Sequence, residues 1–154
     1  MKKFLYCDSC FLITFYQDGY LGSLSQYKGQ FFISKTQIEG ELIKPSDLAT
    51  MVRKNITVIE EDRDDIKDKT NEFSLLYETL SIYDCLCMAY ALLDGYCLIT
   101  DDKALQKKCA IHGIEVKTSK EIIDEFLKGG VNEGDFKHHQ KGGKRKWLTN
   151  QSKF

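Results

Sequence analysis

The chain has 154 residues, enough for one domain with a full core and too few for two domains of ordinary size. A hydrophobic share of 42% and a charged share of 29% are typical of a globular protein, and no apolar run approaches the roughly 20 residues that a bilayer-spanning helix needs. The formal net charge of -1 gives no overall attraction to nucleic acid. We expect a cytoplasmic protein, because acidic and polar residues interrupt the start of the chain before a secretory apolar core could form.

The six cysteines do not form a disulfide or zinc-binding pattern. Five of them lie inside apolar segments, where a reduced thiol behaves as a small hydrophobic side chain. We therefore expect free thiols and no structural zinc. The cysteines stand at positions 7, 10, 85, 87, 97 and 109.

The first half of the chain alternates predicted strands with predicted helices. Apolar and β-branched runs predict the strands, and apolar residues at helical offsets predict the helices. Pro45 separates two helices, because the residue before a proline is pushed out of helical geometry. In chain order the elements are a strand at 3–7, a helix at 11–17, a strand at 31–34, a helix at 35–43, a helix opened by Asp47 and a strand at 55–59.

The second half continues the alternation. The strongly charged run at 60–70 predicts a solvated loop or the exposed face of a helix. Glycines then close the helices that follow, as is common at a helix end. In chain order these elements are an apolar helix at 81–94 before Gly95, a buried strand at 96–100, a short helix closed at Gly113, a strand at 114–118 and a helix from Ser119 with a glycine stop.

This order of elements predicts an α/β protein. Strands that alternate with helices form βαβ units, in which helices cover both faces of a parallel sheet. We expect a three-layer α/β/α domain with a central, mostly parallel sheet over residues 1–130. Residues 131–154 should be a basic C-terminal extension that frays or lies on the surface.

Several acidic residues occupy related places in this arrangement. Asp8 follows the first strand, Asp101 and Asp102 follow the strand at 96–100, and Asp84 lies in the first turn of an apolar helix. Ligands of open parallel sheets bind beyond the carboxyl ends of the strands. We therefore expect the three strand-end acids to meet at one edge of the sheet.

Each acid taken alone has a simpler explanation, because aspartate is a favoured helix N-cap and complements the helix dipole. Asp101 would cap the helix that begins near Lys103, and Ser81 with Asp84 has the spacing of a capping box. Taken together, unpaired carboxylates near one point repel each other unless a cation neutralises them. Magnesium does so with oxygen ligands, and two such ions about 3.5 to 4 Å apart can clamp the attacking and leaving oxygens of a phosphodiester.

Four segments resemble, in the right order, the motifs of the PIN-domain ribonucleases. YCDSCFLI resembles the opening strand, with its aspartate and hydroxyl residue, and ISKTQIEGEL the helix that ends in Glu-Leu. LSIYDCLCMAYAL resembles the aspartate followed by an alanine-rich helix, and LITDDKALQKKCAIHGIEV the Thr-x-Asp motif before a short helix, glycine and strand. The resemblance spans about residues 1 to 130.

Carried over residue by residue, the resemblance implies a catalytic metal site for Mg²⁺ or Mn²⁺. The protein would be an endoribonuclease that hydrolyses RNA by a metal-activated water and leaves a 5′-phosphate. The site acids would be Asp8, Glu41, Asp84 and Asp102, with Asp101 as a possible further ligand and with Ser9 and Thr100 as hydroxyls that orient the acids.

Two of these positions have a competing neighbour. Glu39 and Glu41 point about 200° apart on a helix, so only one can face the site, and the following Leu42 favours Glu41. Asp101 competes with Asp102, and the Thr-x-Asp spacing from Thr100 favours Asp102.

The resemblance also implies partners. Small bacterial PIN proteins are frequently toxins paired with an antitoxin, this chain is similar in size to a VapC-type toxin, and such domains usually form homodimers. The composition of the basic tail, apart from the resemblance, suggests that Lys144, Arg145 and Lys146 with Trp147 contact RNA phosphates and bases, and the alternative is a tail that only aids solubility.

Three other functions compete with the nuclease. Cys7 and Cys10 have the Cys-x-x-Cys spacing of thiol oxidoreductases, although the expected loop proline is absent. Asp8 with Lys103 could serve as a phosphoacceptor, but a second aspartate two residues after Asp8 is missing. A PIN-like domain could also bind a partner without catalysis.

Overall fold

A five-stranded, all-parallel sheet forms the centre of the molecule, with strand order β3-β2-β1-β4-β5. The computed structural model describes residues 4–127. The central strand pairs Leu5 with Phe31 on one side and with Cys97 on the other. The predicted parallel α/β sheet is confirmed. Its strands are β1 (Leu5–Cys7), β2 (Phe31–Ser34), β3 (Thr57–Ile59), β4 (Cys97–Ile99) and β5 (Val116–Lys117).

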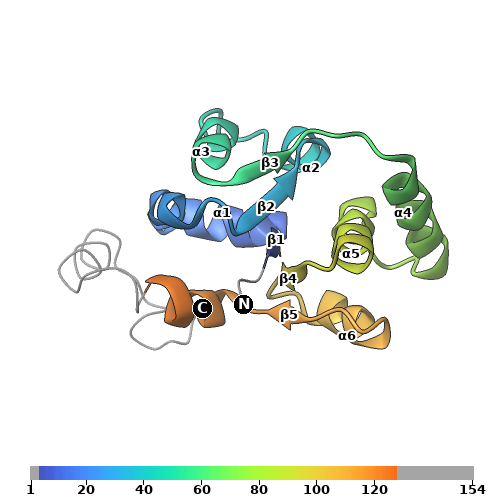
Figure 1. Ribbon diagram of the computed structural model, residues 1–154. Coiled ribbons are helices and arrows are strands. Elements are labelled where there is room, and N and C mark those ends of the chain that lie inside the picture. The colour runs from blue at the N-terminus through green and yellow to red at the C-terminus, as the bar shows by residue number, and fades with distance from the viewer. Residues whose placement is uncertain (1–3, 128–154) are drawn as a thin grey trace.

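Helices cover both faces of this sheet, which makes the fold a three-layer α/β/α domain. In Figure 1, α1, α3 and the last helical segment lie to the left of the strands, and α4, α5 and α6 lie to the right. The helices are α1 (Ser9–Gln17), η1 (Leu21–Tyr27), α2 (Lys35–Glu41), α3 (Leu48–Asn55), α4 (Asp64–Leu76), α5 (Ile82–Asp94), α6 (Lys103–Ile111), α7 (Ser119–Ile122) and the π-helical turn η2 (Ile123–Leu127).

Alternate residues of the central strand belong to two separate hydrophobic cores. Leu5 and Cys7 pack with α1 and α3, whereas Tyr6 packs with α4, α5 and α6. This alternation follows from the pleat of a strand, which points successive side chains to opposite faces. Every residue of β1 and β4 is buried, as expected for strands covered on both sides.

Several predicted helix ends are confirmed. Gly95 has φ 77° and Gly113 has φ 72°, a backbone conformation that glycine adopts without steric cost. Gly95 directly follows α5, and Gly113 follows α6 after one intervening residue. The helix predicted to open at Asp47 is α3, with Asp47 at its N-cap.

The predicted strand at 55–59 starts later in the structure, and the charged run at 60–70 takes the second of its two predicted forms, the exposed face of a helix. Asn55 was expected to begin a strand, but it is the last residue of α3, and its side-chain amide donates to the Met51 carbonyl at 2.7 Å. The charged run at 60–70 enters α4, whose first turn carries two aspartates that complement the helix dipole. The glycine stop after the last helix and the extension at 131–154, including Lys144, Arg145 and Lys146, lie outside the described residues.

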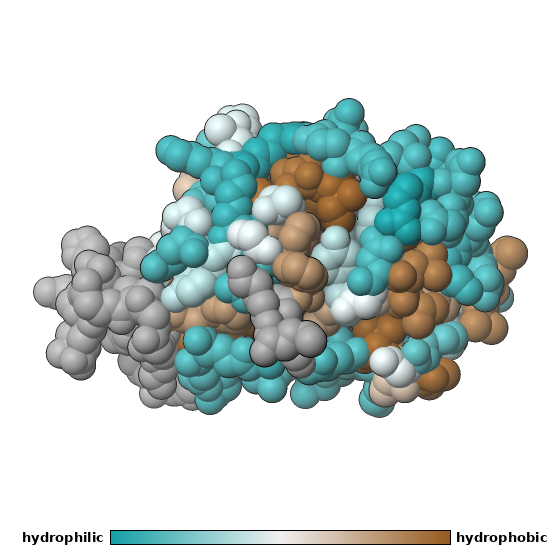
Figure 2. Space-filling model, in the orientation of Figure 1, coloured by the Kyte–Doolittle hydropathy of each residue, from teal (hydrophilic) through white to brown (hydrophobic). Residues whose placement is uncertain are grey.

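Hydrophobic side chains remain exposed on the α4, α5 and α6 side of the molecule, where Figure 2 shows brown patches. Leu75 and Leu76 at the end of α4 and Ile111 at the end of α6 are examples, with Leu75 84% exposed. Leu92 and Leu93 near the end of α5 are also partly exposed. Within residues 4–127, no helix is long and apolar enough to cross a membrane.

Candidate functional site

Asp8 lies at the carboxyl end of the central strand and is buried, with only 6% of its surface exposed. Its carboxylate accepts a hydrogen bond of 2.7 Å from the hydroxyl of Thr100, which follows β4 and is completely buried. Asp8 occupies the N-cap position of α1, where its side chain makes no capping hydrogen bond of good geometry, although the Cys10 amide of the first turn is near enough to lower its pKa. The Thr100 hydroxyl is therefore the main partner of this carboxylate.

Glu41 is the last residue of α2 and reaches toward the same edge of the sheet. The Ser9 hydroxyl donates to Glu41 Oε1 at 2.6 Å, and Ser9 Oγ accepts from Gln37 Nε2 at 2.8 Å. Glu39 is exposed on the other side of the helix. Of the two competing glutamates, Glu41 is the one that contacts residues next to Asp8.

Asp84 caps its own helix and also lies near two of the other acids. It completes a capping box at the start of α5, since its carboxylate accepts from the Ser81 amide at 3.2 Å and its own amide donates to the Ser81 hydroxyl at 3.0 Å. The carboxylate is also close enough to Asp8 and Glu41 for its charge to raise the pKa of both. The capping box thus holds Asp84 in place beside the other acids.

The two aspartates after β4 point in different directions. Asp102 caps α6, accepting from the Leu105 amide at 3.1 Å. Asp101 accepts hydrogen bonds from both the amide and the hydroxyl of Ser119 at the start of α7. The expectation that Asp101 caps α6 was wrong, because the helix begins at Lys103 and the residue directly before it is Asp102. Both carboxylate oxygens of Asp101 are instead bonded to Ser119.

The four acids Asp8, Glu41, Asp84 and Asp102, called the acid cluster below, repel each other. The pKa of Asp8 is raised to about 6, mainly by burial and also by the charges of Asp84 and Glu41, while the Thr100 hydroxyl and the Cys10 amide oppose the increase. Burial likewise raises the pKa of Glu41 and of Asp84, and the charge of Asp102 adds to the effect on Asp84. Desolvation and like charge both disfavour an ionised carboxylate.

No basic side chain neutralises the acid cluster in the described part of the chain. Among residues 4–127, the ion pairs of lysines and arginines involve other acids. His112 is also elsewhere, where it hydrogen-bonds to Tyr77 at 2.6 Å and packs edge-on against Phe73. The cluster is therefore a concentration of negative charge without a protein cation.

The acid cluster fits a hard divalent cation by its chemistry, although its side chains do not enclose one. Among residues 4–127, no three histidine, cysteine, aspartate or glutamate side chains are arranged so that they could jointly hold a metal ion. Glu41, Asp84 and Asp102 each have one oxygen bonded to a neighbouring donor, which leaves the second oxygen as a ligand. An oxygen-only carboxylate set is what magnesium and manganese prefer, and magnesium usually keeps several waters that can bridge to more distant carboxylates.

The cysteines near the cluster do not have the properties of a redox pair. Cys7 is fully buried and Cys10 is exposed. Burial raises the pKa of the Cys7 thiol, and partial burial of the Cys10 side chain together with the charges of all four cluster acids raises the pKa of Cys10 to about 11. A reactive thiol needs a lowered pKa, so the surroundings of this pair disfavour thiol oxidoreductase chemistry.

Helix α5 approaches α2 closely at a glycine between the two competing glutamates. A Cβ atom added to Gly40 would lie 2.0 Å from the Tyr83 hydroxyl oxygen, so a larger residue would require this ring to move. Tyr83 directly precedes Asp84, and Gly40 directly precedes Glu41. This contact therefore lies next to two members of the acid cluster in the chain.

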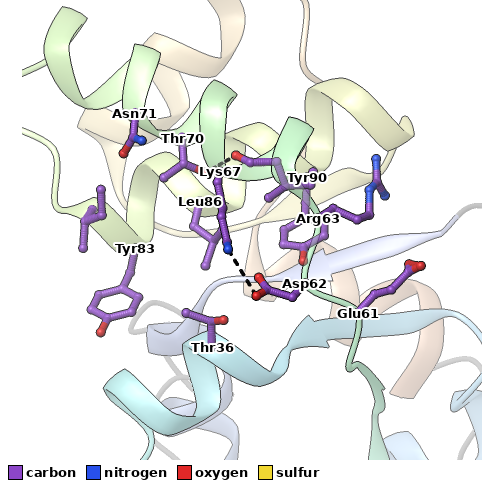
Figure 3. Close-up of a pocket in the computed structure, with 12 residues that line it drawn as sticks. Thr36, Glu61, Asp62, Arg63, Lys67, Thr70, Asn71, Tyr83, Leu86 and Tyr90 are labelled. Carbon is purple, nitrogen blue, oxygen red and sulfur yellow. Dashed lines mark hydrogen bonds and ion pairs between the residues drawn. The ribbon is translucent and has the colours of Figure 1, made fainter.

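A cavity of about 380 Å³ lies between α2, α4 and α5, with Tyr83 on its wall (Figure 3). Lys67 and Asp62, both in its lining, form an ion pair of 3.1 Å. No member of the acid cluster lines this cavity. Its lining is Thr36, Glu61, Asp62, Arg63, Ile66, Lys67, Thr70, Asn71, Ile82, Tyr83, Leu86 and Tyr90.

Sequence patterns missed Gln37, Gly40 and Tyr83 as residues that shape the site. A signal for Gln37 was present, because residues four apart share one face of a helix and Gln37 precedes Glu41 by that spacing. The contact between Tyr83 and Gly40 joins two distant segments and leaves no such local signal. Ser9 and Thr100, which the resemblance named, each donate a hydrogen bond to a member of the acid cluster.

Comparison with known proteins reveals a likeness of fold. No protein-family model matches the chain, and no curated protein matches it. A crystal structure of PAE2754 from Pyrobaculum aerophilum matches with a TM-score of 0.60 and 15% sequence identity, over 80% of this chain and 94% of that one. At this identity the likeness shows the fold alone, and it agrees with the three-layer α/β/α architecture.

Proposed function

We propose that this chain is an endoribonuclease of the PIN-domain kind, dependent on Mg²⁺ or Mn²⁺. The observation that carries the proposal is the acid cluster, whose carboxylates gather at the carboxyl edge of a parallel sheet without a basic partner in residues 4–127. The edge at which these acids lie is where ligands bind in open α/β sheets.

The energetic cost of the acid cluster supports a functional explanation. An apolar or amide side chain at Asp8 would avoid the desolvation of a charge in a site that is almost fully buried. Capping hydrogen bonds account for Asp84 and Asp102, whereas Glu41 ends its helix and the main partner of Asp8 is the Thr100 hydroxyl beyond another strand. A cation bound between these acids would offset the repulsion, and this gives a reason to retain all four.

Each residue of the site would have a separate task in such an enzyme. The four carboxylates would hold the divalent cations, which lower the pKa of an attacking water and neutralise charge on the phosphate. Thr100 fixes one oxygen of Asp8, and Ser9 fixes one oxygen of Glu41. Such hydrogen bonds set the direction in which the remaining carboxylate oxygens point.

The test is cleavage of a panel of labelled RNAs by the purified full-length chain with Mg²⁺, with Mn²⁺ or with EDTA. We expect cleavage that requires the metal and yields 5′-phosphate ends, and a loss of about 100-fold or more in Asp8→Asn. Asp65→Asn is the matched control, because Asp65 is paired with Arg63 and should retain wild-type cleavage. Cleavage in EDTA, or full activity of Asp8→Asn, would refute the proposal.

The same experiment separates a nuclease from a binding module that has kept only the fold. A binding module would retain RNA in EDTA with unchanged affinity and would leave every RNA in the panel intact. The raised pKa of Glu41 and Asp84, beside a buried Asp8, favours the nuclease, because an RNA-binding surface gains nothing from concentrated negative charge.

The proposal also names binding partners. We propose that this chain binds RNA as its substrate, a second copy of itself and a cognate antitoxin protein. The exposed leucines of α4 and α5 give apolar surface that a protein partner could cover. The molar mass of wild type and of Leu75→Glu, measured by light scattering, tests whether two copies of this chain associate. A dimer should dissociate in the variant, whereas a monomer should be unchanged.

A further inference from the structure

Gln37 is a polar side chain that is completely buried, and it uses every hydrogen-bonding position it has. Its amide nitrogen donates to the Cys7 carbonyl at 3.2 Å and to Ser9 Oγ at 2.8 Å. Its oxygen accepts from the Tyr6 hydroxyl at 2.8 Å and from the Cys87 thiol at 3.5 Å. The side chain therefore joins β1, α1 and α5 from its place on α2.

The partners of Gln37 fix the direction of the Ser9 hydroxyl. The Cys7 carbonyl can only accept, so the nitrogen of the Gln37 amide faces it. That nitrogen also donates to Ser9 Oγ, which leaves the single Ser9 proton free to point at Glu41 Oε1, 2.6 Å away. Reversing the amide would place two acceptors against each other at Cys7.

The hydrogen bonds that lead from the sheet to Gln37 are donated in the same direction. The backbone amide of Ser34 donates to the Tyr6 hydroxyl oxygen at 3.1 Å, and the Tyr6 hydroxyl donates in turn to Gln37. The donors thus run one way, from a β2 amide through Tyr6, Gln37 and Ser9 to the carboxylate of Glu41. Hydrogen bonds aligned head to tail polarise one another, so the last donor is strengthened by those before it.

Packing alone does not explain glutamine at this position. A buried amide costs stability unless all its groups are bonded, whereas an apolar side chain of the same size would need no partners. Gln37 lies one helical turn before Glu41 on α2, which puts its amide within reach of the hydroxyl that contacts that acid.

We infer that Gln37 is a positioning residue of the acid cluster, which acts through Ser9 to hold Glu41 in one orientation for a divalent cation. This inference rests on the proposed function for the role of Glu41, but the orientation of Ser9 can be tested without metal.

The first measurement is the affinity for Mn²⁺, determined by electron paramagnetic resonance. It compares the full-length wild type with Gln37→Met, Ser9→Ala and the double variant. We expect each single change to weaken binding about 10-fold, as is typical when a group that orients a metal ligand is removed. The double variant should bind no more weakly than the weaker single variant, because Gln37 acts through Ser9. Wild-type affinity in Gln37→Met, or losses that multiply in the double variant, would overturn the inference.

The second measurement is made on the metal-free protein by NMR. A Ser9 hydroxyl that is buried and bonded on both sides should exchange slowly and show a nuclear Overhauser effect to the γ-protons of Glu41. The effect should vanish in Gln37→Met and persist in Thr70→Val, which removes a buried hydroxyl from α4 that bonds only to the Ile66 carbonyl. If the effect persists in Gln37→Met, the inference is wrong.

The two measurements separate failure of the inference from failure of the proposed function. Wild type that binds no Mn²⁺ would count against the metal-dependent nuclease, and the NMR result would then decide the role of Gln37 alone. Should Gln37→Met not fold, Gln37→Glu replaces it, because a buried, protonated carboxyl keeps an acceptor for Tyr6 and a donor for Ser9. We expect that variant to retain the Overhauser effect, and its loss while the protein stays folded would contradict a positioning role.

Discussion

Acidic side chains gather in two regions of this molecule, and only one of the two has basic partners. Around the start of α4, Arg63 binds Asp65 at 2.8 Å and Asp94 at 2.7 Å, while Lys67 binds Asp62. These acids are exposed or partly exposed, as is ordinary for the solvated face of a domain. The acid cluster at the sheet edge has no such partner in residues 4–127, and its central member is buried.

The two regions differ in their effect on the stability of the fold. Exposed ion pairs contribute little to the free energy of unfolding, typically about 1 kcal/mol or less. The paired acids are therefore best explained as part of the solvated surface of α4 and α5. Unpaired acids under partial burial lower stability. Such a cost is expected where carboxylates bind a cation, and the predictions below test that contrast.

The largest expected effect distinguishes the two glutamates of α2. Glu41→Gln should lower metal-dependent RNA cleavage by about 100-fold or more, because an amide holds a cation poorly and no longer carries charge. Glu39→Gln on the exposed side should leave cleavage within about twofold of wild type. Initial rates at saturating Mg²⁺ measure both, and equal losses in the two variants would remove Glu41 from the site.

The next effect is on stability and depends on pH. The ordinary pKa of Asp8 is 3.8 and burial raises it to about 6 in the folded chain, so the folded state binds this proton more tightly than the unfolded state. Proton binding by Asp8 therefore stabilises the fold fully below about pH 4, and this stabilisation is lost as the pH rises through 6. Metal-free Asp8→Asn should exceed wild type by about 2 to 3 kcal/mol at pH 8 and match it near pH 4.

Urea unfolding at several pH values in EDTA measures this difference. Asp94→Asn provides the comparison from the paired region, where removing a charge from an ion pair should lower stability slightly at pH 8. Added Mn²⁺ should raise the midpoint of wild type more than that of Asp8→Asn, because a ligand stabilises the state that binds it. An Asp8→Asn protein that is less stable than wild type at pH 8 would contradict the cost assigned to Asp8.

A smaller effect separates the adjacent aspartates after β4. Asp101→Ala and Asp102→Ala should each lower the free energy of unfolding by about 1 to 2 kcal/mol, since each carboxylate bonds the first turn of a helix. Cleavage should fall about 10-fold or more only in Asp102→Ala. If cleavage falls in Asp101→Ala and not in Asp102→Ala, then Asp101 belongs to the reactive site and Asp102 has only a structural role.

The smallest effect lies in the paired region itself. Arg63→Gln should lower the free energy of unfolding by about 1 kcal/mol or less, and the difference should shrink as salt screens the lost ion pairs. Its RNA cleavage should equal that of wild type. A loss of cleavage in this variant would show that the α4 region, and not only the sheet edge, takes part in the reaction.

The amino-acid sequence by itself determined the architecture and the approximate place of the acids. Hydrophobic periodicity and glycine at helix ends act locally, so they predicted the alternation of strands and helices and the ends of α5 and α6. The position of Asp8 after β1, and of Asp101 and Asp102 after β4, followed from the rule that parallel strands end at the same edge of a sheet.

Only the tertiary structure decided which acids meet and what holds them. Asp102 rather than Asp101 caps α6, because Asp101 is bound by Ser119 from a helix 18 residues further on. Gln37 contacts Ser9 across 28 residues, and Thr100 contacts Asp8 across 92. Hydrogen bonds between residues so distant in the chain depend on how the layers pack, and side-chain periodicity, which is a local signal, does not record them.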